Sequence, residues 1–300
     1  MNDLTLLTRA RLDAMLLVGT TLAEAKSGYG LSTEAELKQL TAVHQAATGH
    51  PVEVVPTFLG AHTVPKERRD DRARYVDEIV NEMLPEIARQ KLAVYADAFV
   101  DAHAFSLAEA RRVLVAAANA GLGVRLHADQ LADDGAAMLA AELHAASADH
   151  LEHVSDAGIE ALARAGTAAV LLPTATFFLM QQAKPPARRL IEAGVPVVIA
   201  TDFNPGTSPT EAMGAVLEFA CLSLGLSIDE AIAASTLNAA FALGRAEETG
   251  SIEVGKRADL VIHAVPNRYH LVYRFGVRRV RTVIAGGRVV VEDGRLTPRA

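Results

Sequence analysis

The sequence is poor in cysteine and in dense basic segments, and each absence excludes some classes of protein function. Cys221 is the one cysteine in 300 residues, which excludes a disulfide framework and a thiolate zinc cluster. A bound metal ion must therefore be held by His, Asp or Glu. The formal net charge is -7, and no cluster of Lys and Arg supplies the concentrated positive charge that phosphate backbones require. We expect a small-molecule ligand and no nucleic-acid partner.

Long apolar runs are also absent, since no window of about 20 residues is apolar enough to span a bilayer. Met1 to Leu4 do not begin a secretory signal, in which a positive segment precedes a long apolar stretch. These features predict no membrane partner and a cytoplasmic location. Half of the residues are hydrophobic, enough for one large core or a large domain with a small appendage. A homo-oligomer is left open.

Seven short apolar runs alternate with segments of helical period. Runs that are apolar at successive positions are typical of strands covered on both faces, as in a parallel sheet, so the pattern predicts a repeated β-α unit. The runs are "TTLAEAKSGYG" from Thr20, "PVEVVPTFLGAH" from Pro51, "AVYADAFV" from Ala93, "GVRLHADQ" from Gly123, "SADHLEH" from Ser147, "AAVLLPT" from Ala168 and "PVVIATD" from Pro196.

The predicted fold class is α/β, with a TIM-like (β/α)8 barrel over residues 1–246 and a small β domain over residues 247–300. A closed barrel is favoured over an open nucleotide-binding sheet because no Gly-rich phosphate fingerprint occurs. Apolar residues at helical spacing between Leu4 and Leu16 predict that the chain opens on a helix. Because such a barrel has eight strands, we expect its first strand to be absent. Gly-broken, β-branched segments after Gly250 predict the small β unit.

Polar residues follow five of the predicted strands: Tyr29, His62, His127, His150 and Asp202. Each alone has an ordinary explanation as a packing, turn or capping residue. In parallel β-α folds, however, the carboxyl ends of the strands converge and carry the chemistry. Three histidines and an aspartate at matching places therefore indicate one site, and these ligand types suit zinc or iron.

Helix starts are predicted from hydroxyl residues followed three positions later by a carboxylate. Ser208, Pro209 and Glu211 have the N-cap, first-turn proline and early carboxylate of a further helix. Free amides of that helix, with those of Gly206 and Thr207, would suit a substrate carboxylate beside Asp202. The capping-box pairs are Thr33 with Glu36, Ser106 with Glu109, and Ser227 with Glu230. Lys26 ends the first predicted strand and is interpreted as an ion-pairing lysine rather than a modified metal ligand.

Five segments together resemble imidazolonepropionase, a family of the amidohydrolase superfamily. They are "KSGYGLSTEAELK", "PTFLGAH", "LHADQL", "SADHLEH" and "ATDFNPGTSP", in this order. The resemblance runs from about residue 10 to the end. It implies a metal-dependent hydrolase fold, a (β/α)8 barrel with a small β domain. It also implies opening of the cyclic amide of 4-imidazolone-5-propanoate by water, in histidine degradation, to give N-formimidoyl-L-glutamate.

The resemblance also implies roles for particular residues. His127 and Asp202 would hold one divalent metal ion, zinc or iron, and His150 would face the metal-bound water. Asp202, His150 and Gln130 are the expected catalytic residues. Proton transfer is assigned to Asp202, because the Gln130 amide only donates and accepts hydrogen bonds. The residues expected to contact the substrate, which carries a carboxylate, are Tyr29, His62, Gln130, Asn204, Gly206 and Thr207.

The chain departs from the family in one respect. The family has a His-x-His pair on its first barrel strand and an arginine soon after it, and this sequence contains neither. Three explanations are left open. The chain is an N-terminally incomplete enzyme, a pseudoenzyme that binds a small carboxylate ligand, or a hydrolase of another cyclic amide that uses His150 as a replacement ligand.

Overall fold

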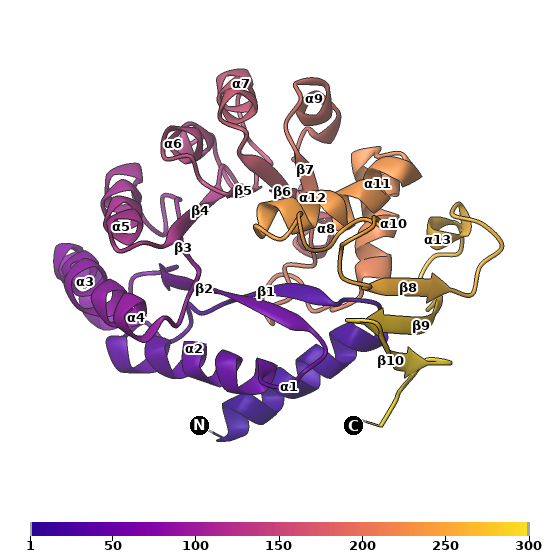
Figure 1. Cartoon of the computed structure of the whole chain (residues 1–300). Helices are drawn as coiled ribbons and strands as arrows, with labels where there is room; N and C mark the ends of the chain where they lie inside the picture. The colour runs from indigo at the N-terminus through magenta and orange to yellow at the C-terminus, as the bar shows by residue number, and fades with distance from the viewer. Residues whose placement is uncertain (1, 299–300) are drawn as a thin grey trace.

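The computed structural model describes residues 2–298, and in these residues seven parallel strands form one curled sheet. Neighbours in the sequence are neighbours in the sheet, in the order β1 to β7 (Figure 1). All seven predicted strands are confirmed. The strands are β1 (Leu22–Lys26), β2 (Glu53–Ala61), β3 (Tyr95–Phe99), β4 (Gly123–Ala128), β5 (Ser147–His150), β6 (Ala168–Leu171) and β7 (Val197–Ile199).

The sheet curls without closing in the described part of the chain. Within residues 2–298, β1 pairs only with β2, and β7 pairs only with β6. The architecture is therefore a half-barrel of alternating strands and helices, which confirms the predicted TIM-like fold with seven of its eight strands.

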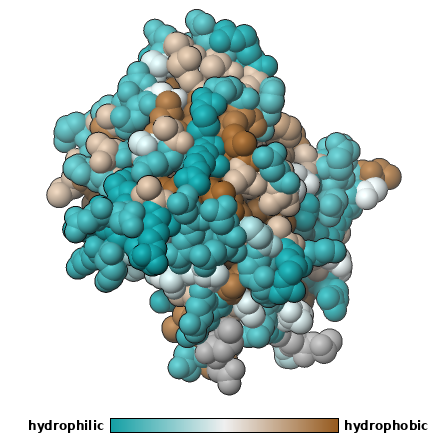
Figure 2. All heavy atoms as spheres, turned by 90° about the vertical axis from the view of Figure 1, so that its left-hand side faces the viewer, coloured by the Kyte–Doolittle hydropathy of each residue, from teal (hydrophilic) through white to brown (hydrophobic). Residues whose placement is uncertain are grey.

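Helices cover the outer face of the sheet (Figure 1), and the face of the molecule that Figure 2 shows is mostly hydrophilic. They pack over a large core in which Phe58, Met83 and Leu126 are fully buried. The helices are α1 (Asn2–Leu17), α2 (Thr33–Ala47), η1 (Lys66–Asp71), α3 (Arg72–Glu78), η2 (Ile79–Met83), α4 (Leu84–Gln90), α5 (Leu107–Asn119), α6 (Ala136–Glu142), α7 (Asp156–Ala165), α8 (Pro173–Phe178), α9 (Ala187–Glu192), α10 (Met213–Leu224), α11 (Ile228–Ser235), α12 (Leu237–Ala242) and α13 (His270–Tyr273).

A small antiparallel sheet follows the β-α units, as predicted. Its order is β11-β10-β9-β8, and it lies beside α1 and β1 (Figure 1). Leu12 and Leu16 of α1 pack against Val283 and Val291 of this sheet. The first helix is thereby held between the two sheets. The strands are β8 (Leu260–His263), β9 (Val280–Ala285), β10 (Arg288–Glu292) and β11 (Arg295–Leu296).

Two of the three predicted capping boxes are present, at Ser106–Glu109 and at Ser227–Glu230. The prediction for Thr33 and Glu36 is wrong. Ser32 is the N-cap of α2 and accepts from the amide of Ala35. The Glu36 carboxylate instead accepts hydrogen bonds from amides of the loop that precedes the helix.

No helix within residues 2–298 is long and apolar enough to cross a membrane.

Candidate functional site

Three histidines come together at the carboxyl ends of β2, β4 and β5, as the sequence predicts. The ring centroid of His127 lies 6.4 Å from that of His62 and 5.3 Å from that of His150. Strand β4 aims its polar side chains inward because side chains alternate along a strand, so Val124 and Leu126 face the helix-covered core. The predicted convergence of the histidines is therefore correct.

His127 is held by a carboxylate from the neighbouring strand. Its Nδ1 atom lies 3.1 Å from Oδ1 of Asp97 on β3, and this contact leaves Nε2 available for a ligand. Burial opposes protonation of His127, but the nearby Asp97 carboxylate raises its pKa. Burial likewise opposes ionisation of Asp97, whereas His127 and Lys26 hold its pKa below the usual value. A carboxylate bound to one imidazole nitrogen is the common support of a metal-ligating histidine.

Asp202 follows β7 and faces the same site. Its backbone is in the left-handed region, at φ 49°, and its carboxylate accepts from the hydroxyl of Thr207 at 3.4 Å. Burial raises the pKa of Asp202, while the charges of His127 and Lys26 lower it. The backbones of Asp129 and His150 are also left-handed, at φ 49° and 82°. Strained backbone of this kind clusters at functional sites.

Three described side chains have ligand atoms within 4.8 Å of one another and could hold a metal ion: Asp97, His127 and Asp149. Imidazole and carboxylate groups are suitable ligands for zinc or iron, so the donor set around His127 fits a metal ion. Asp202 lies outside this group of three. The assignment of Asp202 as a metal ligand stays a prediction.

The loop after Asp202 differs from the prediction. The amides of Gly206 and Thr207 donate to the side-chain oxygen of Asn204, at 2.9 and 2.7 Å. Asn204 thus closes a local turn of the kind that Asn side chains favour. The two amides are therefore already bonded rather than free.

The predicted helix start at Ser208 is wrong. Helix α10 begins at Met213. The hydroxyl of Ser208 instead donates to the carbonyl of Thr201 at 2.6 Å, and its oxygen lies within hydrogen-bond distance of the Thr174 hydroxyl, at 3.1 Å. These bonds fasten the loop to the end of β7. Roles for Asn204, Gly206 and Thr207 in substrate contact stay predictions.

Tyr29 and His62 lie next to each other, and His62 is a neighbour of His127. Their rings meet edge to face, with centroids 5.2 Å apart, and Nδ1 of His62 contacts the carbonyl of Gly28 at 2.9 Å. Tyr29 is 61% exposed, so its ring is accessible to a ligand. Gln130 is half-buried two residues beyond β4. Their substrate contacts, like that of His62, stay predictions.

The carboxylate of Glu36 holds the loop that carries Tyr29. It accepts from the amides of Gly28, Gly30 and Leu31 at 2.9, 2.7 and 2.9 Å. Gly28 has φ +114°, and a Cβ atom there would lie 2.7 Å from the carbonyl oxygen of Leu59. The loop therefore requires glycine at this position and a buried acceptor beneath it.

Sequence reasoning missed four polar residues of the site: Glu36, Asp97, Asp149 and Glu152. Asp97 and Asp149 lie inside predicted strands, where a carboxylate facing the interior of a curled sheet leaves a signal: a charged residue within an apolar run. Glu152 lies two residues after His150 in "SADHLEH". Its side chain is 1% exposed, and burial raises its pKa to about 7.

The fold and these gathered groups define the class, a β/α-barrel hydrolase with a candidate metal centre. The model described as "Amidohydrolase family" matches residues 2–291. A triazine hydrolase from Arthrobacter aurescens shares the fold, with a TM-score of 0.79 at 19% identity, over 98% of this chain and 73% of the other. An adenosine deaminase from Xanthomonas campestris with bound zinc has a TM-score of 0.74 at 21% identity, over 97% and 71% of the two chains.

Curated relatives narrow the class. The chain is 50% identical over 291 residues to an imidazolonepropionase of Symbiobacterium thermophilum, covering 97% of this chain and 68% of that protein. It is also 50% identical over 289 residues to an imidazolonepropionase of Geobacillus kaustophilus, covering 96% and 68%. The chain belongs to the amidohydrolase family and, within it, to the imidazolonepropionases. It spans about two thirds of the length of these relatives. Family and donor set together support a bound metal ion.

Proposed function

We propose that this chain hydrolyses the cyclic amide of 4-imidazolone-5-propanoate to N-formimidoyl-L-glutamate, a step of histidine degradation in the cytoplasm. The observation that carries the proposal is the 50% identity to imidazolonepropionases across the residues that bring His62, His127 and His150 together. We also propose residues 1–246 as the catalytic domain and residues 247–300 as a separate small domain.

In this proposal His127 and Asp202 hold one zinc or iron ion. When bound, the ion polarises the substrate carbonyl and lowers the pKa of a water molecule. His127 would bind through Nε2, because Nδ1 contacts Asp97. The Asp202 carboxylate takes a proton from the attacking water and delivers it to the ring nitrogen that leaves.

The other residues bind and orient the substrate. Burial and the neighbouring His127 hold the pKa of His150 well below its usual value, so its ring is neutral and acts as an orienting hydrogen-bond donor. Tyr29 and His62 contact the imidazolone ring, and Gln130 contacts a polar group through its amide. The loop of Asn204, Gly206 and Thr207 binds the propanoate carboxylate, for which the two amides would exchange their bonds to Asn204.

The test uses the 300-residue chain purified from cells grown with zinc and iron. Elemental analysis gives the metal content per chain, and mass spectrometry follows conversion of 4-imidazolone-5-propanoate to N-formimidoyl-L-glutamate. We expect about one ion per chain and product formation that Asp202→Asn abolishes. A folded, metal-loaded chain that forms no product would refute the proposal. Thermal stabilisation by the substrate without product would then identify a binding protein, and turnover of another cyclic amide would identify a different substrate.

A further inference from the structure

Lys26 ends β1 with its ammonium group among three carboxylates. Nζ lies 2.7 Å from Oδ2 of Asp97, 3.0 Å from Oε1 of Glu24 and 3.3 Å from Oδ2 of Asp149. The side chains of Asp97 and Asp149 are 0% and 5% exposed, and that of Lys26 is 22% exposed. The ammonium is thus the cation at the centre of a largely buried anionic group.

Two of these carboxylates belong to the group of potential metal ligands. Asp97, Asp149 and His127 have ligand atoms within 4.8 Å of one another, and zinc binds such atoms at about 2.0–2.2 Å. The Lys26 ammonium already hydrogen-bonds Asp97 and Asp149. A divalent ion held by both carboxylates would lie against Nζ, where like charges repel at close range in a buried setting.

The charges around Lys26 are nearly balanced when its ammonium group is present. Arg125 is 1% exposed, and its Nε atom lies 3.2 Å from Oε1 of Glu24. Three carboxylates therefore face Lys26 and Arg125. Replacement of Lys26 by an apolar residue would leave three carboxylates facing the single positive charge of Arg125. The two uncompensated negative charges match in size the charge of one divalent ion.

We propose that Lys26 is a built-in cation that excludes a divalent ion from Asp97, Asp149 and His127 and so determines how many ions the protein holds. The ion of the active enzyme then binds outside this group, through Nε2 of His127 and through Asp202. Lys26 acts as a positioning residue as well, because it holds the carboxylate that contacts His127. The location of the catalytic ion rests on the proposed function, whereas the exclusion does not.

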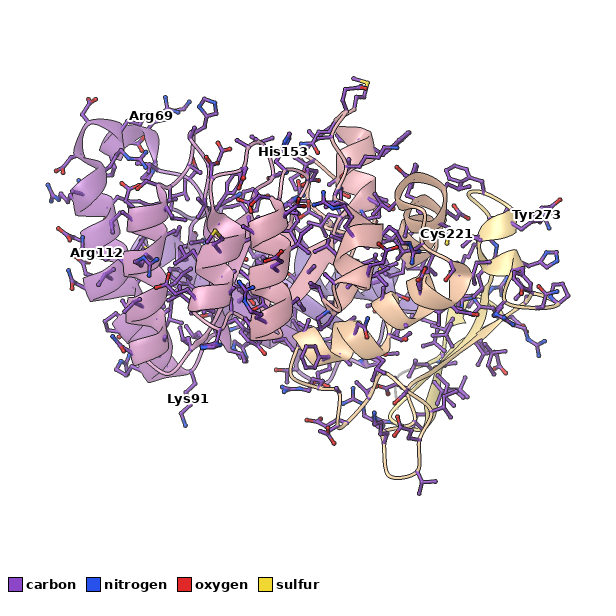
Figure 3. All side chains as sticks on the ribbon, turned by 90° about the horizontal axis from the view of Figure 1, so that it is seen from above. Arg69, Lys91, Arg112, His153, Cys221 and Tyr273 are labelled. Atoms are coloured by element: carbon purple, nitrogen blue, oxygen red, sulfur yellow. The ribbon has the colours of Figure 1, made fainter. Side chains whose placement is uncertain are left out.

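The decisive variant is Lys26→Met, which keeps an unbranched side chain of nearly the same length and removes its charge. Zinc per chain is measured by equilibrium dialysis and elemental analysis, with the melting temperature recorded with and without zinc. We expect Lys26→Met to bind one zinc ion more than the wild-type chain and to gain thermal stability from zinc. Lys26→Met/Asp149→Asn should lose the added ion. Lys91→Met is the control, because Lys91 extends into solvent at the edge of the molecule (Figure 3).

Equal zinc content in folded Lys26→Met and wild-type chains would overturn the proposal. A second arm does not depend on the folding of Lys26→Met: Asp149→Asn alone should leave the zinc content of the otherwise wild-type chain unchanged, and a fall would show that the ion already binds at this group. Wild-type chain that binds neither zinc nor iron would refute the proposed metal-dependent activity, while the difference in zinc content between wild type and Lys26→Met would still decide the role of Lys26.

Discussion

The Nδ1 atom of His150 lies 4.0 Å from Oε2 of Glu152, and neither atom has a hydrogen-bond partner within residues 2–298. Both side chains are buried at the end of β5. Burial raises the pKa of Glu152 to about 7, with a smaller contribution from the nearby charge of Asp202. Because a buried carboxylate without a full set of partners is costly, Glu152 should influence stability near neutral pH.

We predict that Glu152→Gln removes a pH dependence of stability. The ordinary pKa of Glu152 is 4.5 and its folded pKa is about 7, so the folded chain binds the proton more tightly than the unfolded chain. Wild-type stability therefore falls as pH rises from about 4.5 to 7, by up to about 3 kcal/mol, and the loss is complete above this range. The free energy of unfolding in urea, measured at pH 4.5, 6 and 8 with a metal chelator, should fall less with rising pH for the variant than for wild type. Parallel pH profiles would contradict the raised pKa.

We predict that Asp202→Asn reduces hydrolysis by at least about 100-fold, because proton transfer by a positioned carboxylate contributes about this much. Its metal content should fall as well, since an amide is a weaker ligand than a carboxylate. Initial rates and elemental analysis check the two effects. Asp70→Asn, at an exposed position in η1, is the control. Near-normal turnover by Asp202→Asn would rule out Asp202 as the proton-transfer residue.

We predict that Arg125→Met destabilises the fold by about 3–5 kcal/mol, the usual cost of breaking a buried ion pair. Arg125 also donates to Ser147 Oγ at 2.8 Å, and its guanidinium lies 4.2 Å from the ring centroid of Tyr95. The free energy of unfolding in urea measures the effect.

Arg112 provides the matched control. Its side chain is 48% exposed in an ion pair with Asp77, and Figure 3 shows it on the outside of the molecule. Arg112→Met should therefore cost at most about 1 kcal/mol. Equal losses for the two variants would show that the Arg125 network contributes no more than a surface pair.

We predict that Glu36→Gln costs about 1–3 kcal/mol, because the NH2 group of glutamine cannot accept a hydrogen bond and at least one of the three loop amides loses its acceptor. The loop that carries Tyr29 should loosen, so KM should rise more than kcat falls. Glu34→Gln, at an exposed position of the same helix, should leave both unchanged. A loss of stability with unaltered KM would mean that the loop does not contribute to substrate binding.

The sequence predicted the seven strands and the meeting of three histidines for local reasons. Continuous apolar runs indicate strands covered on both faces, and residues after parallel strands share one edge of the sheet. Helix starts were predicted less accurately, because the same side chain can cap a helix or form hydrogen bonds with a loop. Glu36 binds loop amides, and Ser208 fastens its loop to β7, where the sequence pattern favoured helix caps.

The sequence by itself determined the β-α order, the donor types of the site and the family. Only the tertiary structure decided how its charges pair. Lys26 meets Asp97 and Asp149, which lie 71 and 123 residues further along the chain. Such contacts depend on the curl of the sheet and on the register of separate strands, and burial then makes each unpaired charge too costly to leave without a partner. The sequence of a single strand does not indicate which distant carboxylate its lysine will contact.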